Sequence, residues 1–583
     1  MEIKPVSDVL APAGLGAPTL AALVPNEANY KVLLMQPHGE IEGSAAGVWN
    51  RDSVLAERQF GRFLRDARES QADLVVTPEY SMPWVVLVGA IKGGIVPSQG
   101  KLWVLGCESI TYSEIENLTQ DLAPFATVLC ETLQPDPQRF TDPLAYVFLA
   151  PPIEGAGPGR IVVLVQFKTH PMGDENHFEI NGLQRGAHVY QFGGVGNALK
   201  LVSLICSDVF AFHDAHAADI YDRALVVHIQ LNPKPRQDQY RRYRDRLLAF
   251  GGDATELICL NWAKDVHESC EGQLKPWHNI AASAWYLRPD KFDERDATLC
   301  ANHRRGLYYT WLQPLRTHAL FFNFEPATYL LEATKVAHIG VPAAISRRRG
   351  PQLTKTCVWN EATSAWVEQV AVEDGFAAVV GECGDARDEI RRIADRNPLE
   401  AERVLALCAG KIGNTADWHG VRQLDSCVID SSEVIRRLTF CQDTDQDASD
   451  FRIQRLKRCA HLWEILKLDD RLPPALGDLK NGFCLEWSPA YPHQNAMSAN
   501  GQRATVIYMG EDASEGQIEA TAKTVAEFLH RTAANPGEGL AARQRLAVWF
   551  RGNNGDIHSF DSHRYAKIDQ TGDASEFDIG REQ

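Results

Sequence analysis

Residues 201–210 read Leu201-Val202-Ser203-Leu204-Ile205-Cys206-Ser207-Asp208-Val209-Phe210. Largely apolar, partly branched residues lead directly into a cysteine and a polar pair, which predicts a buried strand that ends at a turn. A thiol at a strand end lies at the rim of a sheet, where a substrate can reach it and the N–H groups of the turn point outward. Cysteine is also among the most buried residue types, so a structural core thiol is the alternative for Cys206.

Two other apolar stretches also end on a reactive side chain. Val76-Thr77-Pro78-Glu79 ends on a carboxylate, and Val165-Gln166-Phe167-Lys168 ends on an amine. Taken singly, Glu79 reads as a solvated carboxylate and Lys168 as a surface lysine. Taken together, three strands deliver a carboxylate, an amine and a thiol, each at its C-terminal end.

This trio resembles the catalytic set of the nitrilase superfamily (carbon–nitrogen hydrolases), whose motifs run as apolar-Pro-Glu, apolar-Lys and Leu-Ile-Cys-x-Asp. The resemblance implies an α/β fold, the αββα four-layer sandwich, over about residues 28–345. It implies Cys206 as nucleophile, Glu79 as general base and Lys168 as the group that stabilises the tetrahedral intermediate. A second glutamate after the lysine helps to position the substrate in that family. Glu179 has the usual spacing to a following glycine and is our choice, with Glu175 as the other candidate.

Hydrolysis of an amide or a nitrile needs a nucleophile, a proton shuttle and a site for developing negative charge, and this trio supplies all three. We expect cleavage of a non-peptide C–N bond through a thioester-type intermediate, with an amide favoured over a nitrile. Family members often carry an aromatic residue after the cysteine and an arginine beyond the aspartate. This chain has Ser207 and Phe210 there, so the identity of the substrate stays open.

Three histidines, His213, His216 and His228, follow Cys206. Their spacing to carboxylates does not repeat, so we expect surface or core histidines, with no metal and no cofactor.

The chain has 583 residues, which is too long for one ordinary core. The run Arg347-Arg348-Arg349-Gly350-Pro351 marks the expected boundary. Residues 351–583 are predicted to form a mixed α/β, mainly helical accessory domain of unknown role, with a disordered acidic tail from about 569. This half has no Gly-rich phosphate loop, which disfavours a synthetase fused to the hydrolase.

Composition limits the partners. The net charge is −17, which disfavours binding to nucleic acid or to an anionic membrane surface. No stretch approaches the roughly twenty apolar residues of a membrane span, and the N-terminus lacks a signal-peptide pattern. The 13 cysteines include no CxxC pair, which favours reduced thiols in the cytoplasm.

The resemblance implies a homo-oligomer acting on a small molecule. The alternative is an effector or binding protein in an assembly, in which residues 351–583 recognise a protein partner.

Overall fold

The computed structural model describes residues 1–26, 28–153, 159–173, 178–194, 199–220, 223–232, 238–250, 255–263, 265–270, 273–278, 283–287, 296–312, 317–323, 325–335, 351–372, 380–381, 383–410, 446–511 and 513–560. The chain divides into two compact units. The first comprises Met1–Asp293 and Ala301–Val372, and the second comprises Glu294–Cys300 and Glu373–Gln583.

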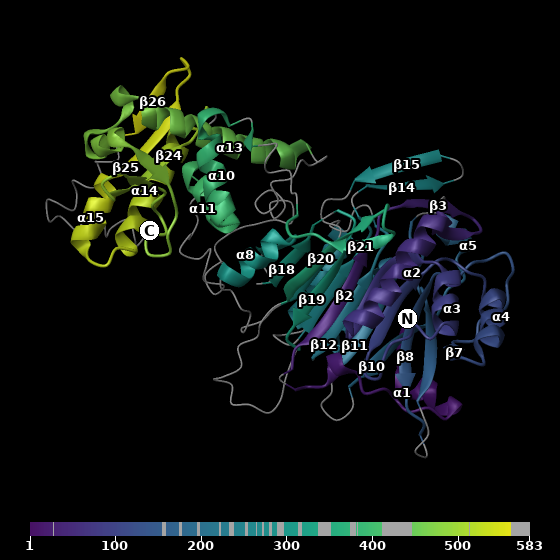
Figure 1. Ribbon diagram of the computed structural model, residues 1–583. Helices are drawn as coiled ribbons and strands as arrows, with labels where there is room; N and C mark the ends of the chain where they lie inside the picture. Colours follow the sequence, from purple (N-terminus) through teal and green to yellow (C-terminus); the bar gives the residue numbers. More distant parts are fainter. Residues whose placement is uncertain are drawn as a thin grey trace. The chain divides into compact units, whose positions relative to one another are not determined.

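The first unit contains a nine-stranded sheet. Its strands, in spatial order, are β21 (Ala365–Glu368), β20 (Gln352–Asn360), β19 (Ala327–Ala333), β2 (Tyr30–Gln36), β5 (Leu74–Met82), β6 (Leu102–Cys107), β8 (Pro143–Ala150), β9 (Arg160–Phe167) and β7 (Thr127–Cys130). The helices α2 (Ser53–Ser70), α3 (Trp84–Lys92) and α4 (Tyr112–Leu122) pack on one face of this sheet (Figure 1). α2 is amphipathic and buries Phe60, Phe63 and Leu64 against the strands, which is the pattern its sequence predicts.

A second, eight-stranded sheet belongs to the same unit. Its strands, in spatial order, are β1 (Glu2–Pro5), β10 (His188–Gly193), β11 (Lys200–Ile205), β12 (Ala224–Ile229), β13 (Thr255–Leu260), β16 (Ala284–Leu287), β18 (Thr317–Phe322) and β17 (Leu307–Leu312). The central strands β11, β12 and β13 run parallel and are buried almost throughout. The strand expected before Cys206 is therefore confirmed as β11.

The two sheets contact each other. Phe192 of β10 packs against Tyr146 and Phe148 of β8, with ring centroids 5.0 and 5.4 Å apart. Gln166 of β9 donates from Nε2 to the carbonyl of Ser203 in β11, at 3.0 Å. The helices α6 (Asp214–Ile220) and α7 (Asp238–Phe250) pack on each other and on the segment that follows β11.

Smaller elements complete this unit. A four-stranded sheet has the order β15 (Gln273–His278), β14 (Asp265–Cys270), β3 (Glu40–Ser44) and β4 (Gly47–Asn50). The short helices are α1 (Val6–Leu10) and α5 (Phe178–Gly182). Helix α8 (Asp296–Arg304) begins in the second unit and ends in the first.

The two units differ from the ranges 28–345 and 351–583 that the sequence suggested. At the N-terminus, β1 pairs with β10 as a parallel edge strand, although residues 1–27 show little periodicity. Beyond the basic run, β20 pairs antiparallel with β19 and extends the nine-stranded sheet. Strand β1 has only four residues, which carry too little pattern to be recognised. Both strands gain stability from pairing with a neighbouring strand, which the sequence does not display.

The second unit is a mixed α/β body. Its helices are α10 (Arg387–Arg396), α11 (Pro398–Cys408), α13 (Gln446–Lys467), α14 (Glu515–Arg531) and α15 (Pro536–Gln544). Its sheet has the order β22 (Phe483–Leu485), β23 (Ala496–Ser498), β24 (Arg503–Tyr508), β25 (Leu546–Arg551) and β26 (Ile557–Phe560). Along β24, Val506 and Tyr508 join the core with α11 and α13, whereas Ile507 joins the core with α14. The sequence also predicts a helix over residues 432–440. This range and the tail expected from about 569 lie outside the described residues.

Within the described ranges, no helix is both long and apolar enough to cross a membrane.

Candidate active site

Three chain segments of the nine-stranded sheet meet at one edge. β5 and β9 run in the same direction, because β5 is parallel to β6 while β8 is antiparallel to both β6 and β9. Glu79, within the last part of β5, and Lys168, directly after β9, therefore lie at the same edge. Asp142 immediately precedes β8, and the register pair Pro143–Phe167 places it opposite Lys168.

The backbone of β5 leaves its regular register around Glu79. The pairing with β6 is regular up to Thr77 and resumes only at Met82. Between these residues Tyr80 has a φ of 57°, a left-handed conformation that a bulky residue rarely adopts. Gly106 of β6 permits this irregular path, because a Cβ there would lie 2.1 Å from the carbonyl oxygen of Pro78.

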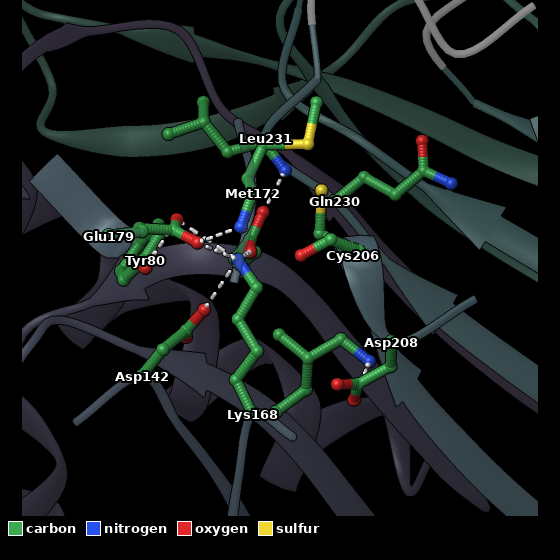
Figure 2. A network of polar contacts seen from close by, with 12 residues as sticks. Tyr80, Asp142, Lys168, Met172, Glu179, Cys206, Asp208, Gln230 and Leu231 are labelled. Carbon is green, nitrogen blue, oxygen red and sulfur yellow. Dashed lines mark hydrogen bonds and ion pairs between the residues drawn. The ribbon is translucent and has the colours of Figure 1, made fainter. Parts of the chain in front are cut away.

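Lys168 is the centre of the cluster (Figure 2). Its Nζ lies 2.7 Å from Glu79 Oε1, 2.9 Å from Glu179 Oε2 and 3.2 Å from Asp142 Oδ2. The Lys168 side chain is fully buried and those of its partners nearly so. Burial opposes the charge of Lys168, but the carboxylates of Glu179 and Glu79 outweigh it and raise the pKa of the lysine well above its usual value. The ammonium is therefore a fixed positive charge.

Two of the carboxylates have further donors. Glu79 Oε2 accepts the backbone N–H of Leu231, which follows β12 of the other sheet. Glu179 accepts the hydroxyl of Tyr80 at 2.9 Å and the backbone N–H of Met172 at 2.7 Å. Burial raises the pKa of Glu79, and the charge of Lys168 opposes that shift. A carboxylate with a raised pKa is a stronger base, which suits a proton acceptor working near neutral pH.

Cys206 reaches this cluster from the eight-stranded sheet. It follows β11 as the first residue of the short helix η3 (Cys206–Ala211), and its φ is +36°. Such a conformation costs about 1–3 kcal/mol at a non-glycine residue and persists only where the surroundings enforce it. Here His228 Nε2 lies 3.0 Å from the Cys206 carbonyl oxygen, and Ser207 Oγ donates to the carbonyl of His170 at 2.6 Å.

Asp208 ties the turn after Cys206 to the turn after Lys168. Its Oδ2 accepts the backbone N–H of Ile205 at 3.0 Å. Its Oδ1 accepts the backbone N–H groups of Thr169 and His170 at 2.7 and 3.1 Å, and the Thr169 hydroxyl at 2.8 Å. The aspartate two residues after the cysteine thus links two segments of the site through hydrogen bonds.

The thiol of Cys206 is a protonated group at rest. Burial, followed by the negative charge of Glu79, raises the pKa of the thiol well above its usual value. The phenol of Tyr240 on α7 lies 3.5 Å from Sγ and also donates towards the sulfur of Met172 at 3.6 Å. The nucleophile must therefore lose its proton to a base during the reaction, and Tyr240 is placed to donate to the resulting thiolate.

We expect Tyr240→Phe to lower the alkylation rate of Cys206 and the hydrolytic kcat/KM by about tenfold or more, because a hydrogen bond to a charged group contributes about 1.5–3 kcal/mol. The measurement is the rate of iodoacetamide labelling, followed by intact mass. Tyr243→Phe is the matched control, since Tyr243 lies on the same helix and packs on Phe212 and His228. Equal rates in the wild type and Tyr240→Phe would contradict this role.

The structure brings Glu79, Lys168, Cys206 and Glu179 together as the sequence suggested, and the alternative Glu175 lies outside the described residues. Sequence reasoning missed Asp142, Tyr80 and Tyr240. The only available signals were the Thr141-Asp142-Pro143 strand start and a tyrosine on an amphipathic helix, and both are commonplace. Two of the histidines have structural partners: His216 contacts the carbonyl of Met1, and His228 contacts the carbonyl of Cys206. Burial lowers the pKa of His228 to about 3.

Glu79, Asp142 and Glu179 have oxygens within 4.8 Å of one another, a spacing that could hold a metal ion. Oxygen donors of this kind suit a hard divalent cation. The Lys168 ammonium already lies among the three carboxyls, at 2.7–3.2 Å. Since a cation there would face that charge directly, the arrangement does not fit a metal, and we derive no metal chemistry from it.

No family model and no curated protein sequence matches this chain. Solved structures similar to it include an amidase of the nitrilase superfamily from Nesterenkonia (14% identity, 54% of this chain and 93% of that chain, TM-score 0.29). Another is Nit3 of Saccharomyces cerevisiae, a member of branch 10 of that superfamily (12%, 51% and 90%, 0.28). A third is the glutamine-dependent NAD+ synthetase of Acinetobacter baumannii (12%, 68%, 0.29), of which the alignment spans only 57%. At such identities and scores, function has to be argued from the site itself.

Proposed function

We propose that this protein is a carbon–nitrogen hydrolase that cleaves a non-peptide amide bond through a Cys206 thioester. The observation that carries the proposal is one buried site in which Glu79 and Lys168 from one sheet meet Cys206 from the other. The contacts between the sheets, and the helices on the nine-stranded sheet, support the αββα four-layer sandwich for the first unit.

The first half of the reaction forms the thioester and releases the leaving nitrogen. Glu79 accepts the proton of the Cys206 thiol as Sγ attacks the amide carbon, so that the carbonyl oxygen becomes an oxyanion. The fixed charge of Lys168 and the backbone N–H that follows Cys206 stabilise that oxyanion. Glu79 then returns its proton to the leaving nitrogen, the C–N bond breaks, and a thioester remains on Sγ.

In the second half, water takes the place of the thiol as the nucleophile. Glu79 takes a proton from a water molecule, whose oxygen attacks the thioester carbon. The collapse of the second oxyanion expels the Cys206 sulfur, which recovers the proton from Glu79, and a carboxylic acid is released. Glu179 forms a further ion pair with Lys168 Nζ, at 2.9 Å, and is the second glutamate we assign to substrate positioning.

A panel of small amides and nitriles, assayed for release of ammonia or amine, tests this function. Ammonia release from amides but not from nitriles supports the proposed bond type. The proposal would be contradicted if the wild-type enzyme hydrolysed no member of the panel and Glu79→Gln left the alkylation rate of Cys206 unchanged.

We expect Glu79→Gln to lower kcat at least a hundredfold, because the amide cannot accept the thiol proton. The acid limb of the pH profile, which reports loss of activity as pH falls through the pKa of Glu79, should disappear in this variant. Because burial raises that pKa, the limb in the wild type should lie above the range of an ordinary glutamate. The measurements are the pH dependence of kcat/KM and of the Cys206 alkylation rate.

Glu108→Gln is the matched control for this variant. Glu108 follows β6 at the neighbouring strand end, and its carboxylate accepts Asn50 Nδ2 at 2.7 Å, a bond that the glutamine oxygen can keep. Activity within a fewfold of the wild type is expected for the control. An equal loss in both variants would mean that Glu79 acts only through the local fold.

A further inference from the structure

Asp142 is a fully buried carboxyl that the reaction above does not use. Its backbone carbonyl accepts the N–H of Lys168 at 2.9 Å, and its Oδ2 lies 3.2 Å from Lys168 Nζ. Among the described residues neither carboxyl oxygen of Asp142 has a conventional hydrogen-bond donor. An oxygen of the Asp142 carboxyl instead lies within 4.8 Å of an oxygen of the Glu79 carboxyl. A hydrogen bond between the two carboxyls lowers the pKa of Glu79 and raises that of Asp142.

Among the described residues, the charges in this cluster do not balance. Glu79, Asp142 and Glu179 offer three negative charges, and Lys168 offers one positive charge. Two uncompensated negative charges in a dry interior cost far more than protonation of a carboxyl. Two carboxyls can also share a hydrogen bond only when one of them carries a proton. At least one of the three is therefore neutral.

The donors identify which carboxyl is neutral. The oxygens of Glu79 accept from Lys168 and from the backbone N–H of Leu231. Those of Glu179 accept from Lys168, Tyr80 and the backbone N–H of Met172. Donors of this kind stabilise the negative charge of a carboxylate. Asp142 has the ion pair with Lys168 in place of such donors. Burial raises the pKa of Asp142 well above its usual value; the charge of Lys168 opposes this shift, and the charge of Glu79 adds to it.

We propose that Asp142 is a positioning residue of this site, held as a neutral carboxylic acid whose O–H donates to the Glu79 carboxylate. The inference rests on the proposed hydrolase function for its consequence in catalysis. The donated hydrogen bond orients Glu79 towards the thiol and limits how far its basicity rises. A neutral Asp142 also leaves the Lys168 charge less compensated, and therefore stronger towards an oxyanion.

The groups that face Asp142 come from four elements. They are Lys168 after β9, Glu79 and Tyr80 of β5, Glu179 of α5 and Cys107 of β6. Lys168 is the cation of this set, so the ionisation of Asp142 would add negative charge beside Glu79. The ionised and neutral forms of Asp142 would therefore affect the pKa of Glu79 differently, and an experiment can distinguish them.

Infrared difference spectroscopy of the full chain, labelled with 13C-aspartate, tests the protonation state and needs no substrate. At neutral pH we expect a labelled neutral-acid carbonyl band in the wild type that is lost in Asp142→Asn. Absence of any such band in the wild type overturns the proposal without use of a variant. A band that persists in Asp142→Asn, or loss of a carboxylate band instead, overturns it as well.

The pH profile of kcat/KM, and of Cys206 alkylation, tests the positioning role. Asp142→Asn keeps an N–H donor and changes no charge, so the acid limb should stay where it is. Asp142→Ala loses the donor, so the limb should move up by about one pH unit. If Asp142 were ionised, both variants would remove a negative charge and move the limb down. A protein without amidase activity still gives the infrared result, so failure of the two proposals is distinguishable.

Discussion

Replacement of Cys206 by alanine is expected to lower amide hydrolysis by at least about ten-thousandfold, because Cys206 supplies the sulfur of the thioester. The fold should persist, since alanine fits the space of the side chain and the bonds that hold the turn come from Asp208 and His228. The measurement is steady-state release of ammonia, combined with intact mass after iodoacetamide labelling. The Cys206→Ala protein should lose the fast-labelling thiol.

Cys357→Ala is the matched control for this loss. Cys357 is a buried thiol of β20 in the same unit, and it belongs to the core beneath α2. Its removal should cost some stability but leave the rate of hydrolysis within a fewfold of the wild type. Undiminished hydrolysis in Cys206→Ala would refute the proposed nucleophile and with it the proposed function.

Replacement of Lys168 by methionine is expected to have the largest effect on stability. It removes the ammonium of Lys168 from a buried cluster of three carboxyls and leaves uncompensated charge, a change that typically costs about 3–5 kcal/mol. Hydrolysis should also fall by about a hundredfold or more through loss of the oxyanion charge. Native-state hydrogen exchange of the backbone N–H groups of β5 and β9 measures the stability change locally.

The loss in Lys168→Met should depend on pH with a defined sign. Burial raises the folded-state pKa values of Glu79 and Asp142, and without Lys168 they rise further. A carboxyl with a raised folded-state pKa contributes full stability below its unfolded pKa and loses it as pH rises through the folded value. The variant should therefore be closer to the wild type at pH 5 than at pH 8.

Lys92→Met serves as control, because Lys92 forms an exposed ion pair with Asp121 on the surface and should change stability by less than about 1 kcal/mol. A similar loss in both lysine variants, or a deficit in Lys168→Met that shrinks at high pH, would contradict the charge argument.

The local sequence was sufficient for the elements that carry the trio. The apolar and periodic patterns predict a strand over Tyr30–Gln36 and a helix over Ser53–Ser70, and β2 and α2 have these bounds. Strands β5, β9 and β11 lie within a few residues of the apolar runs that lead to Glu79, Lys168 and Cys206. Each of these segments is a long apolar run or has strong hydrophobic periodicity, and such patterns predict helices and strands best. The homo-oligomer and a protein partner for residues 351–583 stay predictions.

By itself, the sequence determined which strands place Glu79, Lys168 and Cys206 at or near their C-terminal ends, because side-chain chemistry at the end of an apolar run is a local property. Only the tertiary structure decided that Asp142 lies opposite Lys168 and that Tyr240 lies against the thiol. The first depends on the antiparallel register of β8 with β9, and the second on how α7 packs beside the turn after β11. Register and helix packing are set by contacts between distant segments, which no local pattern records.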